Sequence, residues 1–277
     1  MRYIIKSRSA LFAMLVVLAY AALAGGCASS GRPDQPARAL EGRQDVPAGY
    51  LPPTALPDSL ALISPPPAAG SGALANDEEA SRKALALRGT PRWTLAIEDA
   101  DLRKAAGAFS CAADAPLTEQ VTPHLYLLMR RAAIDAGRST SAAKDYYRRP
   151  RPFMVNNEPI CTPEDEGFLR ASGSYPSGHS AIGWAWALIL TEIAPERTDA
   201  ILARGRAIGE SRVICNAHWQ SDVVEGRFMG AGTVARLHAD AAFRADLEAA
   251  KAEFGALRAK GLKPRRDCAA VAATPAK

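Results

Sequence analysis

The sequence is poor in the residues that most often carry chemistry or build β-sheets. Its 277 residues include only four histidines and five cysteines, and aromatic residues make up 6% of the chain. Runs of alternating β-branched residues, which half-buried strands favour, are nearly absent. No C-x-x-C or H-E-x-x-H motif is present, so the spacing offers no metal site. The lack of strand patterns predicts an all-α fold.

An apolar run at the N-terminus is too short to span a membrane. Three basic residues precede ALFAMLVVLAYAALA, about fifteen residues that end in small side chains, the pattern of a secretory signal. Cleavage after Ala24 and acylation at Cys27, within the lipoprotein-like LAGGC, both fit this segment. We therefore predict a signal peptide over residues 1–27 and an exported protein, periplasmic or secreted, with a lipid anchor at Cys27 as the alternative.

Composition and charge exclude several classes of protein. The chain is 48% hydrophobic and 23% charged, as in an ordinary globular domain rather than a disordered or fibrous one. The formal net charge of +5 falls to +2 without the three positive charges of the signal, and much of the remainder comes from KGLKPRR near the C-terminus. This weak basicity predicts no nucleic-acid partner.

Proline and cysteine indicate the domain organisation. Residues 28–76 contain LPPTALP and SPPPAAGSG, which cannot sustain a helix or a central strand, so we predict an extended arm there. One domain is expected over residues 77–260, and a basic flexible tail over residues 261–277. Four cysteines remain besides Cys27, and an even number in an oxidising compartment favours two disulfides with three connectivities open. These four are Cys111, Cys161, Cys215 and Cys268.

Helix signals dominate the predicted domain. Thr122 and Pro123 form a cap-then-proline start for a helix that stops near Gly137, and Thr162 with Pro163 repeats the device. AIGWAWALILTEI is apolar all round, which predicts a helix buried in the core. Further helices are expected at about 196–213, 221–237 and 240–260, with core residues Ile208, Val213, Phe243, Leu247 and Phe254.

Three short segments concentrate unusual chemistry. They are KDYYRRPRP at residues 144–152, PSGH at 176–179 and SRVICNAHWQSD at 211–222. Together they supply fixed cations, a serine hydroxyl, two of the four histidines and one carboxylate. Arginines bind phosphate with paired donors, lysine adds a point charge, and a helix start offers free backbone N–H groups. We expect these segments to fold into one site for a tetrahedral oxyanion.

The same segments resemble the signature of the phosphatidic acid phosphatase type 2 (PAP2) superfamily: K-x6-R-P, then P-S-G-H, then S-R-x5-H-x3-D. Every specified position is matched. The wider stretches GSYPSGHSAIGWAWAL and SRVICNAHWQSDV are similar to the class A bacterial non-specific acid phosphatases, and the similarity runs from about residue 48 to about residue 250. The resemblance implies a compact helical bundle, no cofactor, and metal-independent hydrolysis of phosphomonoesters to inorganic phosphate, with phosphotransfer as a side activity.

The resemblance also implies a role for each matched residue. His218 is the nucleophile that forms a phosphohistidine, Asp222 orients its imidazole, and His179 protonates the leaving alcohol and then activates water. The groups expected to hold the phosphoryl oxygens are Lys144, Arg151, Ser177, the backbone N–H of Gly178, and Arg212. Phosphoryl transfer depends above all on positioning and charge stabilisation, which this set of residues can supply.

Two other functions are also compatible with the sequence, and the residues near the motifs have expected positions of their own. The alternatives are a vanadate-dependent haloperoxidase and a non-catalytic anion-binding surface lipoprotein. The sequence leaves the oligomeric state open, with a homo-oligomer as one option. Arg148 and Arg149 are interpreted as surface charges or secondary substrate contacts, because the spacing selects Arg151. His124 and His238 are expected to be structural or solvent-facing, PEDEG at 163–167 to be a solvated helix start near the pocket entrance, and most of Tyr146, Tyr147, Tyr175 and Trp219 to pack in the core.

Overall fold

The computed structural model describes residues 47–265, 267 and 268. The predicted signal peptide with Cys27, and the first part of the predicted arm, lie outside these residues. The described chain forms helices and connecting loops and contains no β-strand, as the sequence predicts for an all-α protein. None of the described helices is both long enough and apolar enough to cross a membrane.

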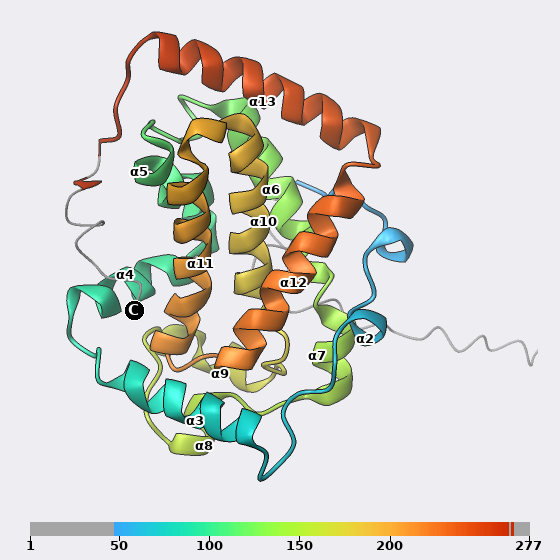
Figure 1. Cartoon of the computed structure of the whole chain (residues 1–277), viewed down its shortest axis with the longest axis vertical. Helices are drawn as coiled ribbons and strands as arrows, with labels where there is room; N and C mark the ends of the chain where they lie inside the picture. The colour runs from blue at the N-terminus through green and yellow to red at the C-terminus, as the bar shows by residue number, and fades with distance from the viewer. Residues whose placement is uncertain (1–46, 266, 269–277) are drawn as a thin grey trace, which may run out of the picture. The chain divides into compact units, whose positions relative to one another are not determined.

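The helices follow one another along the chain and are joined by short loops (Figure 1). The longer ones are α3 (Gly72–Leu85), α4 (Pro91–Ala100), α6 (Pro123–Arg138), α10 (Gly178–Ile193), α11 (Thr198–Ile214), α12 (Gln220–Leu237) and α13 (Ala241–Ala259). The shorter ones are η1 (Pro53–Ala55), α2 (Ser59–Leu62), η2 (Leu102–Phe109), α5 (Ser110–Ala113), α7 (Ser141–Tyr147), α8 (Pro152–Asn156), η3 (Pro163–Asp165), α9 (Glu166–Arg170) and η4 (Pro195–Arg197).

Helix α10 forms the centre of the domain, as its apolar sequence predicts. It packs against α6, α11 and α12, and it is buried on nearly every side because these neighbours surround it (Figure 1). Trp186 anchors α10 to α6, since its indole N–H donates to the Met129 carbonyl at 2.8 Å. The expected core residues of α11 and α13 are also buried. This packing fixes the positions of α10, α11 and α12 relative to one another.

The helix starts follow the sequence signals only in part. Helix α6 begins at Pro123 as predicted, but the Thr122 hydroxyl bonds to Thr118 instead of capping the helix. The second cap-then-proline start, at Thr162 and Pro163, yields the 3₁₀ turn η3 followed by the short helix α9. Helices α3 and α4 were not predicted, although Ser71 and Thr90 accept hydrogen bonds from backbone N–H groups of their first turns.

The described part of the predicted arm contains helical turns and is attached to the domain. The Asp58 carboxylate caps the short helix α2, and the Ser71 hydroxyl starts α3 inside the segment expected to be extended. The Tyr50 and Leu51 N–H groups donate to the two oxygens of the buried Asp135 carboxylate, at 2.8 and 3.2 Å. Side-chain caps thus supply the helix starts that the proline content argues against.

Two disulfides and one ion pair connect distant parts of the chain. Cys161 bonds to Cys215, and Cys111 bonds to Cys268, so one of the three open connectivities is realised. The tail predicted to be flexible is tethered where the structure describes it, through Cys268 and through Lys263, whose ammonium lies 2.6 Å from the Asp114 carboxylate. Residues 266 and 269–277 lie outside the described part.

Candidate active site

The three segments singled out in the sequence converge at one end of the helical core. PSGH leads into the first turn of α10, while SRVICNAHWQSD spans the last turn of α11, the turn after it and the first turn of α12. KDYYRRPRP runs from α7 to the start of α8. The converging ends of α10, α11 and α12 lie at the bottom of Figure 1, close to α3, α8 and α9. The predicted site residues therefore share one region of the fold.

His218 lies between a guanidinium and a carboxylate. Its Nε2 is 3.0 Å from Arg151 Nη1, and its Nδ1 is 3.3 Å from Asp222 Oδ2. A guanidinium can only donate, so Nε2 accepts and the ring carries its hydrogen on Nδ1, facing the carboxylate. Both His218 and Asp222 are buried. This arrangement leaves the lone pair of Nε2 facing the Arg151 guanidinium, and an imidazole attacks through such a lone pair.

Asp222 is held by the start of its own helix. It is the third residue of α12, and its Oδ2 accepts the Trp219 backbone N–H at 2.8 Å, which closes a capping contact. The spacing of four residues between His218 and Asp222 therefore reflects a turn followed by a helix start. The pKa of Asp222 is raised by burial, while Arg149, this backbone N–H and Lys144 oppose the rise.

Arg151 and Lys144 donate most of their hydrogen bonds to backbone carbonyls. Arg151 Nε donates to the Leu169 carbonyl at 2.9 Å and Nη1 to the Ala217 carbonyl at 2.9 Å. Lys144 Nζ donates to the carbonyls of Gly173 and Ser174 at 3.1 and 3.3 Å. Burial lowers the pKa of Arg151 to about 9 and lowers the pKa of Lys144 as well. Arg151 also donates to the carbonyls of Ser172 and Gly173, so both side chains hold the loop before α10 in addition to providing charge.

Arg212 differs from these two cations because, among the described residues, two of its side-chain nitrogens have no hydrogen-bond partner at all. Its side chain is 1% exposed, and among the residues that the structure describes its Nε and Nη1 have no hydrogen-bond partner. Burial lowers its pKa to about 10, against the nearby charges of Asp165 and Asp99, so it stays protonated at neutral pH. Buried N–H donors without partners are costly unless a ligand satisfies them. Arg212 thus has the donors that an oxyanion would use.

The start of α10 adds a second histidine and further donors. Ser177 is the N-cap residue, and its hydroxyl accepts the Ser180 backbone N–H at 3.2 Å and the Ser180 hydroxyl at 2.9 Å. Gly178 is the first residue of the helix, where backbone N–H groups have no partner within the helix. His179 is half-buried, and its Nε2 lies 3.1 Å from the Ala100 carbonyl at the end of α4. Because a carbonyl only accepts, Nε2 carries the hydrogen of the neutral ring.

Electrostatic interactions connect all of these groups. Burial lowers the pKa of His218 well below its usual value, and the charges of Arg151, Lys144 and Arg212 lower it further. Burial also lowers the pKa of His179, and so do the charges of Arg212, His218 and Arg151. Each histidine therefore lies within electrostatic range of the cations and of the other histidine. Both rings are neutral near neutral pH, and an anion bound among the cations would raise both pKa values.

Sequence reasoning missed two buried polar contacts next to the site, one made by Arg149 and one made by Asp99. Arg149, interpreted as a surface charge or a secondary contact, is buried, with Nη1 2.7 Å from Asp222 Oδ1 and Nη2 2.7 Å from Asp77 Oδ2. Asp99 on α4 accepts from the Ser211 hydroxyl at 2.6 Å and pairs with Arg204. Ser211 thus faces Asp99 in the described structure. No local pattern marks Asp77 or Asp99, because their partners lie far along the chain.

The remaining predicted residues take mostly structural positions. Tyr175 and Trp219 are buried, with the Tyr175 hydroxyl donating to the Ser64 carbonyl and the Trp219 indole N–H donating to the Pro150 carbonyl, whereas Tyr146 is exposed. Arg148 is exposed and ends α7 in a left-handed conformation. His124 is exposed, and His238 contacts Glu192 at the surface. The acidic turn η3 borders the site, since the charge of Asp165 acts on Arg212.

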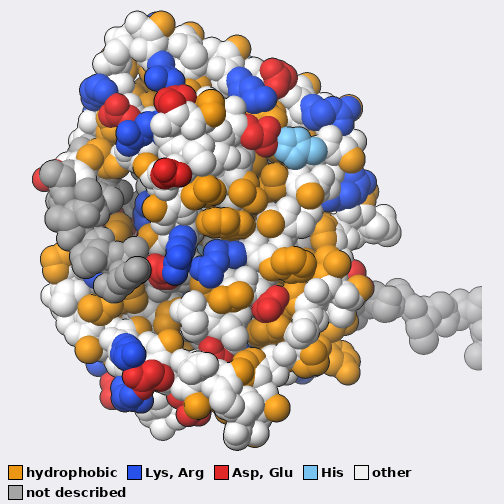
Figure 2. All heavy atoms as spheres, viewed as in Figure 1, with side chains coloured by type: hydrophobic (Ala, Val, Ile, Leu, Met, Phe, Trp, Pro, Cys, Tyr) orange, Lys and Arg blue, Asp and Glu red, His pale blue; other side chains and the backbone are white. Residues whose placement is uncertain are grey.

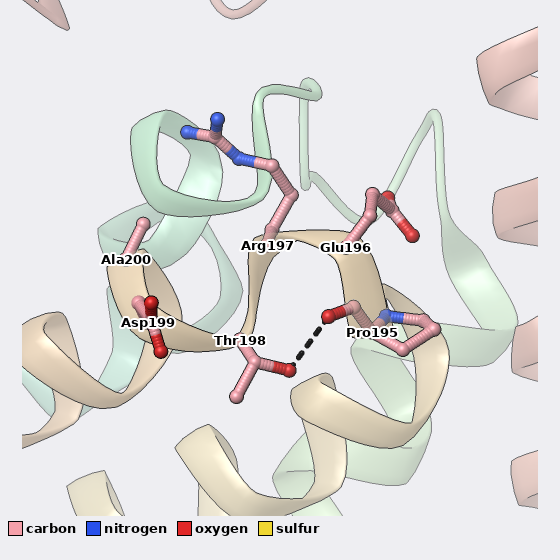
Figure 3. Close-up of a pocket in the computed structure, with 6 residues that line it drawn as sticks. All are labelled: Pro195, Glu196, Arg197, Thr198, Asp199 and Ala200. Carbon is pink, nitrogen blue, oxygen red and sulfur yellow. Dashed lines mark hydrogen bonds between the residues drawn. The ribbon is translucent and has the colours of Figure 1, made fainter.

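A separate open pocket lies at the opposite end of α10. It has a volume of about 380 Å³ and is lined by Pro195–Ala200, where η4 leads into α11 (Figure 3). The Thr198 hydroxyl donates to the Pro195 carbonyl at 2.7 Å across this turn, and Arg197 donates to the Ala112 carbonyl. These contacts build a helix-to-helix turn. The pocket contains no histidine or cysteine and none of the predicted site residues.

The charges on the face shown in Figure 2 do not indicate another ligand class. On the face shown in Figure 2, acidic and basic side chains are interspersed among apolar ones and form no broad area of one sign. Within the described residues, no group of three or more histidine, cysteine, aspartate or glutamate side chains has a metal-binding arrangement. The grouped cations at the ends of α10, α11 and α12 therefore remain the candidate site.

The comparisons with known proteins agree with this fold. The PAP2 superfamily matches residues 122–245, a span that includes all three segments. A non-specific acid phosphatase of Providencia stuartii is 47% identical over 204 residues, which cover 73% of this chain and 82% of that protein. An acid phosphatase of Zymomonas mobilis is 42% identical over 209 residues, covering 75% and 79%. A non-specific acid phosphatase of Salmonella typhimurium is 43% identical over 195 residues, covering 69% and 78%.

Relatives this similar over most of the chain establish its family. The chain belongs to the PAP2 superfamily and, within it, to the family of the non-specific acid phosphatases. The all-α architecture agrees with this membership.

Proposed function

We propose that this protein is a metal-independent acid phosphatase that hydrolyses a broad range of phosphomonoesters through a phosphohistidine on His218. The observation that carries the proposal is the buried Arg212 guanidinium, in which two nitrogens have no partner among the described residues and which shares a cationic site with the neutral His218. A phosphoryl group has the charge and the acceptor oxygens to satisfy these donors. The names of the relatives support phosphatase activity over the haloperoxidase and the non-catalytic lipoprotein.

In the first step, the lone pair of His218 Nε2 attacks phosphorus and the bond to the ester oxygen breaks. The Nδ1 hydrogen stays on the ring, and the Asp222 carboxylate beside it stabilises the positive charge that develops. Lys144, Arg151 and Arg212, with the Ser177 hydroxyl and the Gly178 N–H, hold the three phosphoryl oxygens. These cations supply the charge stabilisation that phosphoryl transfer needs.

His179 serves as the acid and then as the base. Its Nε2 hydrogen faces the Ala100 carbonyl, so the proton gained at acidic pH goes onto Nδ1 and passes from there to the leaving alcohol. In the second step, water gives a proton to the neutral ring and attacks phosphorus, the P–N bond breaks, and inorganic phosphate leaves. An alcohol in place of water gives the phosphotransfer side activity. The lowered pKa of His179 favours an acidic optimum.

Export to the periplasm or medium forms part of the proposal. Two disulfides in a chain of this length support an oxidising compartment. Mass spectrometry of the mature N-terminus distinguishes cleavage after Ala24 from acylation at Cys27. Light scattering of the mature protein tests for a homo-oligomer.

The decisive experiment is rapid quenching of the mature protein with labelled phosphomonoester in excess chelator. We expect acid-labile, base-stable phosphate on His218, and its absence in His218→Ala. Turnover without a phosphoenzyme, or full activity of His218→Ala, would contradict the mechanism. Loss of turnover in chelator, with recovery on adding a divalent metal, would contradict metal independence.

A further inference from the structure

Two neighbouring arginines of KDYYRRPRP have opposite environments. Helix α7 ends at Arg148, which takes a left-handed conformation with φ of 43° and keeps its side chain exposed. The chain reverses there, and Pro150 follows closely, so the helix does not continue. Arg149 consequently points inward, with its side chain 8% exposed. An arginine is rarely buried unless it is paired, so its partners indicate its purpose.

The partners of Arg149 form a chain that ends at His218. Nη2 contacts Asp77 Oδ2 and Nη1 contacts Asp222 Oδ1, each at 2.7 Å. Arg149 Nη1 also donates to the Ser221 hydroxyl at 2.8 Å. Asp222 Oδ2, the other oxygen of the carboxylate, faces His218. Each oxygen of Asp222 therefore has its own partner, and the carboxylate cannot rotate without breaking one of these contacts.

Asp77 fixes the far end of this chain. It lies on α3, before the residues matched by the superfamily, and its carboxylate is 3% exposed. Asp77 Oδ1 accepts the Ser221 backbone N–H at 2.8 Å, and Oδ2 accepts the Ser221 hydroxyl at 2.6 Å. Asp77 thus connects α3 to Arg149 and to the first turn of α12. The guanidinium of Arg149 also lies over the Trp219 ring, 5.3 Å from its centroid.

We propose that Arg149 is a positioning residue of the reaction, which, anchored by Asp77, holds the Asp222 carboxylate in place and ionised behind His218. This inference rests on the roles proposed above for His218 and Asp222. A carboxylate that is fixed before the reaction stabilises the developing charge on His218 without rearranging at that moment. In addition, the positive charge of Arg149 opposes the effect of burial on the pKa of Asp222.

The charges of Arg149 and Asp77 should affect the pH dependence of activity. The charged or titratable groups that face Asp222 come from several elements: Asp77 on α3, Lys144 on α7, Arg149 and Arg151 on the connection to α8, and His218 before α12. Removing a positive charge raises the pKa of both Asp222 and His218, whereas removing the negative charge of Asp77 lowers both. The two changes therefore shift the acidic limb of activity in opposite directions.

The test compares Arg149→Gln, Arg149→Lys and Asp77→Asn by kcat and KM for p-nitrophenyl phosphate across pH. We expect Arg149→Gln to lower kcat about 10- to 100-fold, with little change in KM. This is the loss seen when a residue that orients a metal ligand is removed, and Arg149 orients Asp222 in the same way. The acidic limb of Arg149→Gln shifts to higher pH, and that of Asp77→Asn shifts to lower pH. Arg149→Lys restores part of the rate, because it keeps the charge and loses the paired donors. If Arg149→Gln fails to fold, the other two variants still carry the test.

Arg131→Gln is the matched control, because it removes an arginine–aspartate pair, with Asp246, that lies away from the site. It should leave kcat and the pH profile unchanged. Wild-type rates and unshifted acidic limbs in the Arg149 and Asp77 variants would overturn the inference, provided that the wild-type protein forms the phosphoenzyme. If the wild-type protein turns over without a phosphoenzyme, the proposed function fails instead.

Discussion

Arg151 Nη1 lies 3.0 Å from His218 Nε2, so the atom proposed to attack phosphorus accepts a hydrogen bond from a group proposed to bind the phosphoryl oxygens. The contact selects the tautomer of His218, since only the Nδ1–H form leaves a lone pair on Nε2. The same contact occupies that lone pair in the described structure. The site therefore holds the proposed nucleophile, His218, in one orientation, and its lowered pKa keeps the ring neutral near neutral pH.

Arg212 should contribute more to phosphate binding than its charge alone. Arg212→Lys keeps a cation but loses the unpartnered Nε and Nη1 donors, so we expect kcat/KM to fall about 10- to 100-fold. Inhibition by inorganic phosphate should weaken in parallel. Arg206→Lys, on the same helix but exposed and paired with Glu210, is the control and should leave both quantities unchanged. An unchanged phosphate inhibition constant in Arg212→Lys would refute the direct contact.

His179→Ala should affect substrates according to their leaving groups. An alkyl phosphate needs a proton on its leaving oxygen, and general acid catalysis contributes about 100- to 10,000-fold. A p-nitrophenolate leaves without that proton, so its rate should fall much less. Initial rates with both substrates check this, with exposed His124→Ala as the control. Equal losses for the two substrates would argue against the acid role of His179.

Buried histidines should make the protein less stable in acid. Burial lowers the pKa of His218, so the unfolded chain takes up a proton below its own pKa of about 6.5 while the folded protein does not. The free energy of unfolding from this group is thus fully present above about pH 6.5 and falls at lower pH, by up to about 1.4 kcal/mol per pH unit. Asp135 acts in the opposite direction, because burial raises its pKa to about 6.

Urea unfolding between pH 7 and pH 5 measures this effect. His218→Asn should lose part of the decline in stability that the wild-type protein shows, whereas exposed His124→Asn should keep it. The same decline in all three proteins would show that His218 does not resist protonation in the folded state.

The two disulfides should differ in their effect on activity. Their sequence separations of 54 and 157 residues correspond to about 4 and about 5 kcal/mol of chain-entropy stabilisation. Cys215 caps α11 between Arg212 and His218, so Cys161→Ala/Cys215→Ala should lower both the melting temperature and kcat/KM. Cys111→Ala/Cys268→Ala is the matched control and should lower the melting temperature alone. Equal activity in the two double variants would contradict this difference.

Helix α12 approaches the start of α10 so closely at Gly226 that no side chain should fit there. A Cβ there would overlap the carbonyl oxygen of Ser177, which is backbone and cannot move without shifting the N-cap of α10. Gly226→Ala should therefore lower both kcat/KM and the melting temperature. Gly232→Ala, on the same helix with no neighbour within 4 Å, should raise stability by about 0.5–1 kcal/mol. Thermal melts and steady-state rates of both variants test this contrast.

Much of the fold and of the candidate site followed from local patterns. The apolar run of α10 predicted a central helix, because a helix that is apolar all round requires neighbours on every side. Helices α6, α11, α12 and α13 begin and end within a few residues of their predicted bounds. The spacing of the three motifs also selected Lys144, Arg151, His179, Arg212 and His218, which the structure brings together.

Other features depended on contacts that no local pattern encodes. Arg148 and Arg149 are adjacent and chemically identical, yet one is exposed and the other is buried, because the chain turns through a left-handed residue at Arg148, directly after α7. The proline-rich arm predicted extended chain, but the hydroxyl of Ser71 and the carboxylate of Asp58 each capped a helix.

The sequence alone determined which chemical groups this protein possesses and their spacing along its helices, because periodicity, caps and motif spacing are local properties. Only the tertiary structure decided which of those groups meet. Asp77 and Arg149 are 72 residues apart, and Asp99 and Ser211 are 112 apart, so their pairing results from how α3, α4, α11 and the connection between α7 and α8 pack together. Packing also left two nitrogens of Arg212 without a hydrogen-bond partner among the described residues. A buried polar group takes whichever partner the surrounding helices present.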